Sequence, residues 1–499
     1  MYFRRVQNPS RVTRITILLC CFLVQFSYAQ NDAAIPLTLP QTIELAQSDA
    51  PNVLIAKTRL SNSYWFYQRF LSNYKPQIDL TATLPNLNRS ISEIIQPDGT
   101  SLFARRAIMT NSIGVSLVQD IAATGGTLFL NTSLQRLDVF KTNINDASSS
   151  YLSVPVSIGF NQPIFGFNQL KWDRQTEPIR YQEATRAYAE RMEDVAVDAT
   201  RLFFDLLIAQ LNLKAARRDR VNADSLYTIS QGRFSVGRIA ETELLQIELS
   251  VRNAENALAQ ANLDVQTSTE QLRNFLGIQQ AVTFDLVVPE TIPEFVVDPD
   301  KALELARLYR SEPLTFERRL IEAERDLDRA TRERNQIDVF GNFGLSQTGS
   351  DLVDAYRNPL DQEVVRIGID VPIADFGKNR ARVEVAQSER ELEQQLVTQE
   401  RVNFEQQILL QVRRIELLRS QVAIAERAYE VGRQSENLTR NRYYIGKIGV
   451  TDLNLAIRDQ EAARRSYVAA LQTFWVAYYD LRRATLYDCL TGTPLVSDN

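Results

Sequence analysis

The chain of 499 residues contains no histidine, three cysteines, and only 18 glycines and 17 prolines. Without an imidazole it has no histidine general base, no Ser/His or Cys/His nucleophile pair and no histidine-containing zinc site. A phosphate-cradling loop of the P-loop kind is also missing. We therefore expect neither an enzyme nor a cofactor. The scarcity of glycine and proline favours long, uninterrupted elements over many small ones.

An excess of basic charge is also missing. The net charge is −5, and Lys and Arg alternate with Asp and Glu along the whole chain. A nucleic-acid-binding surface would need a concentrated basic patch. We therefore predict no nucleic-acid partner.

Long apolar runs are missing except at the N-terminus, where Arg4, Arg5, Arg11 and Arg14 precede an apolar run and the small residue Ala29. This pattern predicts a secretory signal peptide over residues 1–29. A membrane anchor is the weaker alternative, because a span needs about 20 apolar residues. Lipoprotein processing at Cys20 is a further alternative, but it is less favoured because the residues before Cys20 are leucines and not small residues. An exported chain without a further apolar run can span a membrane only through β-strands.

One stretch of twelve residues occurs twice in similar form. "RFSVGRIAETEL" starts at Arg233 and "RYYIGKIGVTDL" starts at Arg442, 209 residues later. Solenoid units are about 20 to 50 residues long, so this period indicates a duplicated half-chain. Matching residues upstream are also 209 positions apart, as far back as residue 158. Further upstream, "KPQIDL" at Lys75 and "RNQIDV" at Arg334 are 259 residues apart. The first half therefore carries about 50 extra residues. We predict repeats over 30–280 and 301–489, a proline-rich connector over 281–300 and a tail over 490–499.

Helical periodicity dominates both repeats. Apolar residues follow Ala240 at alternating gaps of four and three residues for five heptads, and the same seam recurs 209 residues later. Such seams are typical of coiled coils. Each repeat is therefore predicted to hold an antiparallel hairpin, with helices over 178–231 and 239–276 in the first and over 378–441 and 450–486 in the second.

Strand periodicity is confined to a few segments. Apolar residues alternate with small or polar ones after Ile78 and Val154, and again over residues 336–347 and 363–373. Transmembrane barrel strands have this pattern, although half-buried strands of a soluble sandwich share it. Four strands cannot close a barrel and an open edge is excluded in lipid, so several protomers would have to share one.

Several motifs together resemble the TolC-type outer-membrane efflux proteins. They are "LTLPQTIELAQSDAPNV" from Leu37, "KPQIDL", "SIGFNQPIFGFNQ" from Ser157, "RIGIDVPIADFGKNR" from Arg366 and the two glycine motifs. The resemblance implies an α+β membrane protein whose duplicated, long antiparallel coiled-coil hairpins form a trimeric α-helical tunnel. Four strands per subunit would close a shared, twelve-stranded transmembrane β-barrel.

The resemblance also implies a function. Such proteins are passive exit channels of tripartite efflux or type I secretion systems in the outer membrane, and they extend into the periplasm. The implied partners are two further copies of the chain, a periplasmic adaptor protein, an inner-membrane pump reached through the adaptor, and outer-membrane lipid. The alternative is a periplasmic or surface coiled-coil scaffold without a pore.

The two glycine motifs are the candidate docking site for the adaptor. Gly237 and Gly446 permit the turn between antiparallel helices, and Thr242 and Thr451 are predicted to cap the helices that follow. Apolar side chains at an exposed tip favour a docking partner. The predicted docking residues are Arg233, Val236, Gly237, Ile239, Thr242, Arg442, Ile445, Gly446, Ile448 and Thr451.

The candidate entrance gate consists of Asp452, Glu243 and Tyr443. The resemblance places Asp452 in a ring of carboxylates that narrows the entrance, and it pairs Tyr443 with Glu243 by a hydrogen bond. Both acids are expected in the first turn of a helix, where negative charge suits the helix dipole. Leu455 stands where some members carry a second acid, and Ile448 where some carry an arginine.

The extra segment of the first repeat reads as a hairpin over residues 112–140. It either adds strands to the barrel or covers its outer mouth. The second placement would keep the barrel of the family intact, so it is the one we expect.

Overall fold

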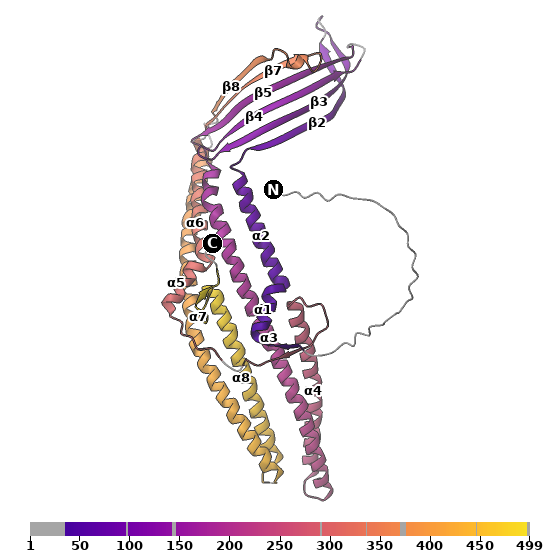
Figure 1. Cartoon of the computed structure of the whole chain (residues 1–499), viewed down its shortest axis with the longest axis vertical. Coiled ribbons are helices and arrows are strands. Elements are labelled where there is room, and N and C mark those ends of the chain that lie inside the picture. The colour runs from indigo at the N-terminus through magenta and orange to yellow at the C-terminus, as the bar shows by residue number, and fades with distance from the viewer. Residues whose placement is uncertain are drawn as a thin grey trace, which may run out of the picture.

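The computed structural model describes residues 35–95, 98–141, 146–289, 292–335, 337–369, 376–445 and 447–496. The predicted signal peptide lies outside these residues. The molecule is elongated, with one β-sheet at one end and long helices that extend away from it to two hairpin ends (Figure 1). We call these ends the hairpin tips.

Two long hairpins form the helical body. The first joins α3 (Gln169–Ser235) to α4 (Glu241–Phe275), and the second joins α7 (Lys378–Tyr444) to α8 (Val450–Thr485). Helices α3 and α7 have 67 residues each, which corresponds to about 100 Å at about 1.5 Å per residue. No helix in the described ranges is both long and apolar enough to cross a membrane.

Helix α3 begins nine residues before the predicted start at Pro178. The side chain of Asn168 caps the helix by accepting a hydrogen bond of 3.1 Å from the backbone N–H of Lys171. Proline removes a single backbone donor from the ladder, and packing of this part of α3 against neighbouring helices outweighs that loss. The proline therefore lies inside the helix and does not begin it.

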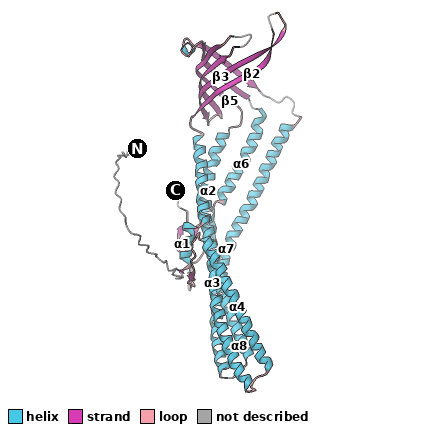
Figure 2. Ribbon diagram, turned by 90° about the vertical axis from the view of Figure 1, so that its right-hand side faces the viewer, coloured by secondary structure: helices cyan, strands magenta, loops and turns pink. Residues whose placement is uncertain are grey.

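Shorter helices complete the wall between the sheet and mid-height (Figure 1). They are α1 (Leu39–Asp49) and α2 (Pro51–Ser72) in the first repeat, and α5 (Pro299–Tyr309) and α6 (Glu312–Arg332) in the second. Helix α2 packs on α3, α3 on α6, and α6 on α7 (Figure 2). Near the tips the contacts run from α4 to α3, from α3 to α8 and from α8 to α7.

The main core lies at mid-height, where α3 and α8 cross. Its largest buried side chains include Phe203, Phe204, Phe474 and Tyr478. Strand β1 (Ile35–Leu37) and strand β6 (Phe284–Leu286) pair in parallel beside it, so the connector between the repeats joins the start of the first repeat. A short pair, β9 (Tyr487–Asp488) and β10 (Thr493–Pro494), follows α8.

The large sheet has six strands, all antiparallel to their neighbours. In spatial order they are β2 (Gln77–Ile95), β3 (Ser101–Ile121), β4 (Gly126–Val139), β5 (Ser148–Ile164), β7 (Ile337–Gly349) and β8 (Leu360–Ile369). Residues 370–373 of the last predicted strand lie outside the described residues.

The expected placement of the extra hairpin over the outer mouth is wrong. Strands β3 and β4 lie inside the sheet, between β2 and β5. Their connection lies at the helical end of the sheet, where Asn168 donates a hydrogen bond of 2.9 Å to the carbonyl of Ala122. Backbone pairing along both edges of the hairpin satisfies its N–H and C=O groups, and a hairpin over the mouth would lose that pairing.

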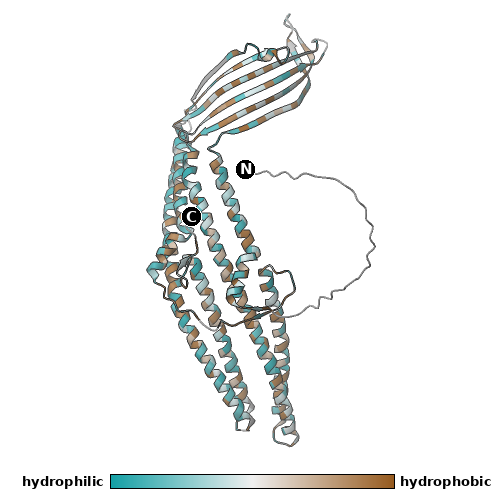
Figure 3. Cartoon of the chain, in the orientation of Figure 1, coloured by the Kyte–Doolittle hydropathy of each residue, from teal (hydrophilic) through white to brown (hydrophobic). Residues whose placement is uncertain are grey.

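Near its helical end the register gives the sheet one apolar and one polar face. One row of directly opposed residues runs from Ile78 through Leu117, Leu130 and Ile158 to Phe343. The neighbouring row, on the other face, contains Ser116, Asn131 and Ser157, and Ser116 donates a hydrogen bond of 2.6 Å to the side chain of Asn131. The alternation is visible along each strand in Figure 3. Successive side chains point to opposite faces of a strand, so one face is suited to lipid and the other to water.

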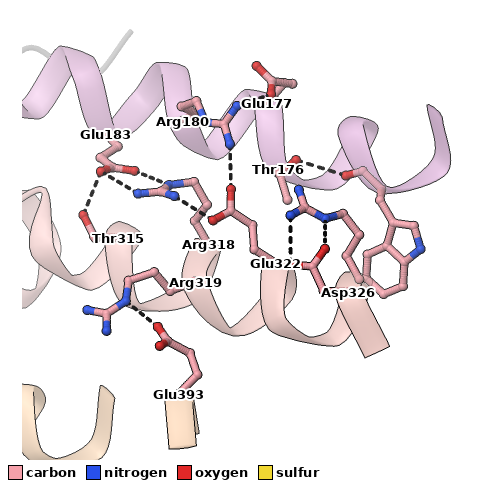
Figure 4. A network of polar contacts seen from close by, with 12 residues as sticks. Thr176, Glu177, Arg180, Glu183, Thr315, Arg318, Arg319, Glu322, Asp326 and Glu393 are labelled. Atoms are coloured by element: carbon pink, nitrogen blue, oxygen red, sulfur yellow. Dashed lines mark hydrogen bonds and ion pairs between the residues drawn. The ribbon is translucent and has the colours of Figure 1, made fainter. Parts of the chain in front are cut away.

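An ion-pair network joins α3 to α6, and α6 to α7 (Figure 4). Arg318 of α6 donates to Glu183 of α3 at 2.6 Å and to Glu322 of its own helix at 2.9 Å. Its neighbour Arg319 contacts Glu393 and Glu400 of α7. Both arginines are partly buried, so these pairs are less screened than fully exposed ones.

We expect Arg318→Met to lower the thermal stability of the helical wall. The change leaves Glu183 and Glu322 without their shared cation, a loss of about 1–3 kcal/mol for partly buried groups. Arg325→Met is the matched control, because Arg325 pairs with its own sequence neighbour Asp326. The measurement is the loss of circular dichroism at 222 nm on heating. Equal melting temperatures for both variants would contradict a role of Arg318 in joining the helices.

Candidate functional site

The two hairpin tips share an equivalent backbone hydrogen bond. Gly237 has a φ of +69°, and the backbone N–H groups of Gly237 and Arg238 donate to the carbonyls of Phe234 and Arg233, each at 2.9 Å. This pair of bonds is the Schellman motif, which favours glycine at its left-handed position. At the second tip the N–H of Lys447 donates to the carbonyl of Arg442 at 3.0 Å, the equivalent bond. Gly446 lies outside the described residues.

The predicted capping by Thr242 and Thr451 is wrong. Helix α4 begins at Glu241 with Ala240 as its N-cap, and α8 begins at Val450 with Gly449 as its N-cap. Neither N-cap has a side-chain hydrogen bond. Each threonine is already the second helical residue, because the residue two positions before it has an extended backbone and serves as the N-cap. Glu243 and Asp452 lie in the first turns, where the helix dipole favours negative charge.

A small apolar cluster joins the two tips. Ile247 of α4, Tyr443 of α7 and Leu453 of α8 are only 3 to 4% exposed. We call these three residues the tip cluster. Leu226, Tyr227, Ile448 and Ile457 pack around it, so all four long helices contribute. Ile247 and Leu453 belong to the heptad seams of the sequence, but heptad periodicity does not indicate that the two seams meet.

Arg233 adds a charged contact between the hairpins. Its guanidinium carbon lies 5.7 Å from the centroid of the Tyr443 ring. A cation at this distance from an aromatic ring is attracted by about 0.5–1 kcal/mol at an exposed site. This contact was not predicted from the sequence, which paired Tyr443 with Glu243. Glu243 is half-buried and Asp452 is exposed.

The predicted docking residues differ in exposure. Val236 and Ile445 are 68% and 66% exposed. Thr242, Thr451, Gly237 and Arg442 are exposed as well. Ile239 and Ile448 are half-buried, and Ile448 packs against the tip cluster. The apolar surface open to a partner therefore centres on Val236 and Ile445.

Above the tip cluster the hairpins meet along a polar seam. Arg218 of α3 pairs with Glu461 of α8 at 2.9 Å, and Arg464 of α8 donates to Asn212 of α3, also at 2.9 Å. Burial raises the pKa of the neighbouring Asp219, although Arg218 opposes this shift. Gln460, which interrupts the apolar seam of α8 in the sequence, is itself buried.

The described residues contain no group of three or more Cys, Asp or Glu side chains placed to hold a metal ion. The candidate site is therefore an assembly of helix ends, and its chemistry is packing, charge and hydrogen bonding.

Comparison with known families identifies the chain. Residues 72–278 and 318–485 match the model of the family described as outer membrane efflux protein, and the two segments correspond to the two repeats. The chain belongs to the outer membrane efflux protein family. This efflux protein is therefore an outer-membrane channel protein that extends into the periplasm, as the sequence motifs predicted.

Solved structures share the fold of this efflux protein. It matches the CmeC outer membrane channel of Campylobacter jejuni with a TM-score of 0.65 at 14% identity, over 90% of this chain and 85% of that one. The match to CusC has a TM-score of 0.63 at 14% identity, over 90% and 91% of the two chains. The open state of the Neisseria gonorrhoeae MtrE channel matches with a TM-score of 0.58 at 14% identity, over 90% and 88%. No curated protein matches this efflux protein by sequence.

Proposed function

We propose that three copies of this chain form a closed conduit that carries substrates passively from the periplasm through the outer membrane. The proposal rests on the two edges of the sheet, because the strand at each edge is connected to a helix of the wall. Helix α2 leads into β2 at one sheet edge, and β8 at the other edge is followed by α7. One copy can therefore meet the next through both layers at once, as a closed ring requires.

Exposed apolar side chains on both sides support this ring. An exposed apolar residue recurs every seven positions along helix α7 and at its C-cap, at Leu410, Leu417, Ile424, Val431, Leu438 and Ile445. We call these six residues the α7 stripe. On the opposite side, α4 exposes Leu245, Leu249 and Leu263, and α2 exposes Leu54, Ile55 and Trp65. Apolar surface of this extent on a monomer indicates a partner, and a second copy supplies the complementary side.

Antiparallel packing of α7 against α4 of the next copy would match these residues in height. Counted from the helix ends at the tips, Leu438 of α7 and Leu249 of α4 lie within two residues of the same level, and so do Ile424 of α7 and Leu263 of α4. The ring would place six hairpin tips at one end of the conduit.

At that end we infer a gate between the hairpins of each copy. The tip cluster and the contact between Arg233 and Tyr443 hold the two hairpins together, whereas the seam above them is polar. Water can solvate the ions of a polar seam after separation, so the tip cluster is the main apolar barrier to opening. Asp452 and Glu243 add carboxylates near the axis of the ring, where like charges repel.

The conduit would serve a tripartite efflux or type I secretion system, with the energy supplied by an inner-membrane pump. A periplasmic adaptor protein would dock on the six tips through the predicted docking residues, with Val236 and Ile445 as apolar anchors. The passage of hydrophilic solutes is supported by the polar face of the sheet.

Planar-bilayer recording with the purified protein tests the conduit. We expect discrete conductance steps from a trimer. An intact trimer without conductance would overturn the conduit and favour a coiled-coil scaffold.

Val236→Asp is expected to abolish export in cells and to leave bilayer conductance unchanged. A carboxylate at the tip would have to be desolvated against the adaptor, at a cost of several kcal/mol per contact. Val221→Asp is the matched control, because Val221 of α3 is 65% exposed, close to the 68% of Val236. Normal export by the Val236 variant would remove the tips from adaptor docking.

Asp452→Ala is expected to weaken the block of conductance by multivalent cations added from the tip side. Three carboxylates near one axis attract such cations, and the alanine variant lacks them. Asp459→Ala, which removes another exposed carboxylate of α8, is expected to keep the block. An unchanged block in the Asp452 variant would exclude Asp452 from the entrance.

A further inference from the structure

The two repeats contribute different numbers of strands to the sheet. The offset of 259 residues makes β7 the equivalent of β2, and the offset of 209 residues makes β8 the equivalent of β5. Strands β7 and β8 pair directly, with Ile337 opposite Ile369. Their equivalents in the first repeat, Ile78 and Phe160, are separated by β3 and β4. Strands β3 and β4 therefore have no counterpart in the second repeat.

The lengths agree with an insertion at this place. The loop between β7 and β8 covers residues 350–359, whereas the equivalent positions in the first repeat enclose residues 91–150. These segments hold ten and sixty residues, a difference of fifty that follows directly from the two offsets. The whole excess of the first repeat is thus the hairpin β3–β4 with the outer ends of its neighbours.

The insertion preserves the two faces of the sheet. The row that starts at Ile78 reaches Ile158 of β5 through Leu117 and Leu130. Ile158 is two residues from Phe160, so it lies on the same face of β5. An added pair of strands also leaves the direction of β5 unchanged, so β5 still leads back to α3. The insertion is therefore compatible with an unaltered helical body.

Both inserted strands are long enough to cross a bilayer. Strand β4 has 14 residues and pairs along its length with β3 on one side and with β5 on the other. A tilted transmembrane strand needs about 9–11 residues. Their faces also continue those of the neighbouring strands, with Leu117 and Leu130 on the apolar face and Ser116 and Asn131 on the polar face.

We propose that β3 and β4 are part of the membrane wall, and that the pore built by three copies has eighteen strands, six from each, in place of the twelve that the family resemblance implied. This inference rests on the proposed trimeric conduit. Barrel diameter grows roughly in proportion to strand number, so the pore is about 1.5 times as wide. Natural barrels of about 16–18 strands enclose an aqueous channel.

The wider pore has a consequence for its cargo. The inserted strands add Ser116, Asn131, Ser133 and Gln135 to the polar face. These four neutral hydrogen-bonding side chains share their face with charged groups such as Asp79, which lies opposite Ser116, at a diameter that a hydrated solute can pass. The chemical class that fits is a bulky hydrophilic solute, and selection by size is left to the tip end.

Cysteine labelling on intact cells tests the placement of β4. In a background with Cys489→Ser, the variants Leu130→Cys and Asn131→Cys place a thiol on opposite faces of β4, and Leu80→Cys and Thr81→Cys do the same on β2. The probe is a membrane-impermeant maleimide. We expect the thiols at positions 131 and 81 to be labelled through the pore, and those at positions 130 and 80 to be at least tenfold less labelled.

Comparison of the labelling on β4 with that on β2 distinguishes failure of this inference from failure of the proposed conduit. Equal labelling at positions 130 and 131, with alternation kept at positions 80 and 81, would overturn the inference and leave the conduit intact. Loss of alternation on both strands would overturn the proposed membrane assembly itself, and the inference with it.

A second measurement counts the strands directly. Electron cryomicroscopy of the full-length trimer in lipid nanodiscs is expected to show eighteen strands, and twelve would overturn the inference. Replacing residues 91–150 by the ten residues 350–359 should join β2 to β5 directly and reduce the barrel diameter to about two-thirds. A folded replacement variant with an unchanged diameter would also overturn it. If that variant does not fold, the strand count of the parent protein decides.

Discussion

Leu453→Asp is expected to hold the conduit open and to raise its resting conductance several-fold. Leu453 is 3% exposed between the hairpins. A carboxylate at this place either loses its hydration or separates the tips, and separation lets water reach it. A desolvation penalty of about 3 kcal/mol shifts a two-state equilibrium by more than about 100-fold. The open state should therefore predominate.

Leu455→Asp is the matched control for this change. Leu455 lies two residues further along α8 and is 53% exposed, so a carboxylate there remains solvated. Single-channel recording of both variants and of the unmodified protein gives the comparison. If Leu453→Asp and Leu455→Asp conduct alike, the tip cluster is not the barrier between the closed and open states.

Ile424→Asp is expected to abolish assembly of the trimer and to leave the single chain folded. Ile424 lies in the middle of the α7 stripe and is 67% exposed, so a carboxylate costs the free chain little. In the proposed ring the side chain is buried, and burial of an isoleucine contributes about 1.5–3 kcal/mol. This loss of apolar burial occurs at all three subunit interfaces of the trimer. Each interface would also have to bury the charge of the new aspartate.

Ala423→Asp controls for the added charge. Ala423 is the preceding residue and is also exposed, but it lies about 100° around the helix from the stripe. Mass photometry of the purified proteins should give a monomer for the Ile424 variant and a trimer for the Ala423 variant. A trimer of normal stability with Ile424→Asp would move the subunit interface away from the α7 stripe.

Local periodicity made the helices and strands predictable. Seams with gaps of four and three residues indicated α4 and α8, and alternation at Ile78 and Val154 indicated β2 and β5. The predicted helix start at residue 178 was wrong, because the helix continues through Pro178 where neighbouring helices pack beside it. Capping by Thr242 was misleading for a similar reason, since one residue of extended backbone moves the start of a helix.

The contacts between the hairpins were less predictable. Ile445 and Ile448 are equivalent in chemistry and three residues apart, yet the first is exposed and the second packs on the tip cluster. The choice depends on the relative rotation of α7 and α8, which no local pattern encodes. The contact of Arg233 with Tyr443 joins residues 210 positions apart and depends on the same packing.

The sequence by itself determined the duplication, the two hairpins, the turn at each tip and the family, because repeats, heptads and glycine turns act over a few neighbouring residues. Only the tertiary structure decided that the extra hairpin β3–β4 lies within the sheet and that the tips meet in one apolar cluster. The residues of an amphipathic strand do not by themselves specify which strand lies beside it, because several neighbours would pair equally well. The pairing that satisfies every backbone group of the whole sheet selects among them.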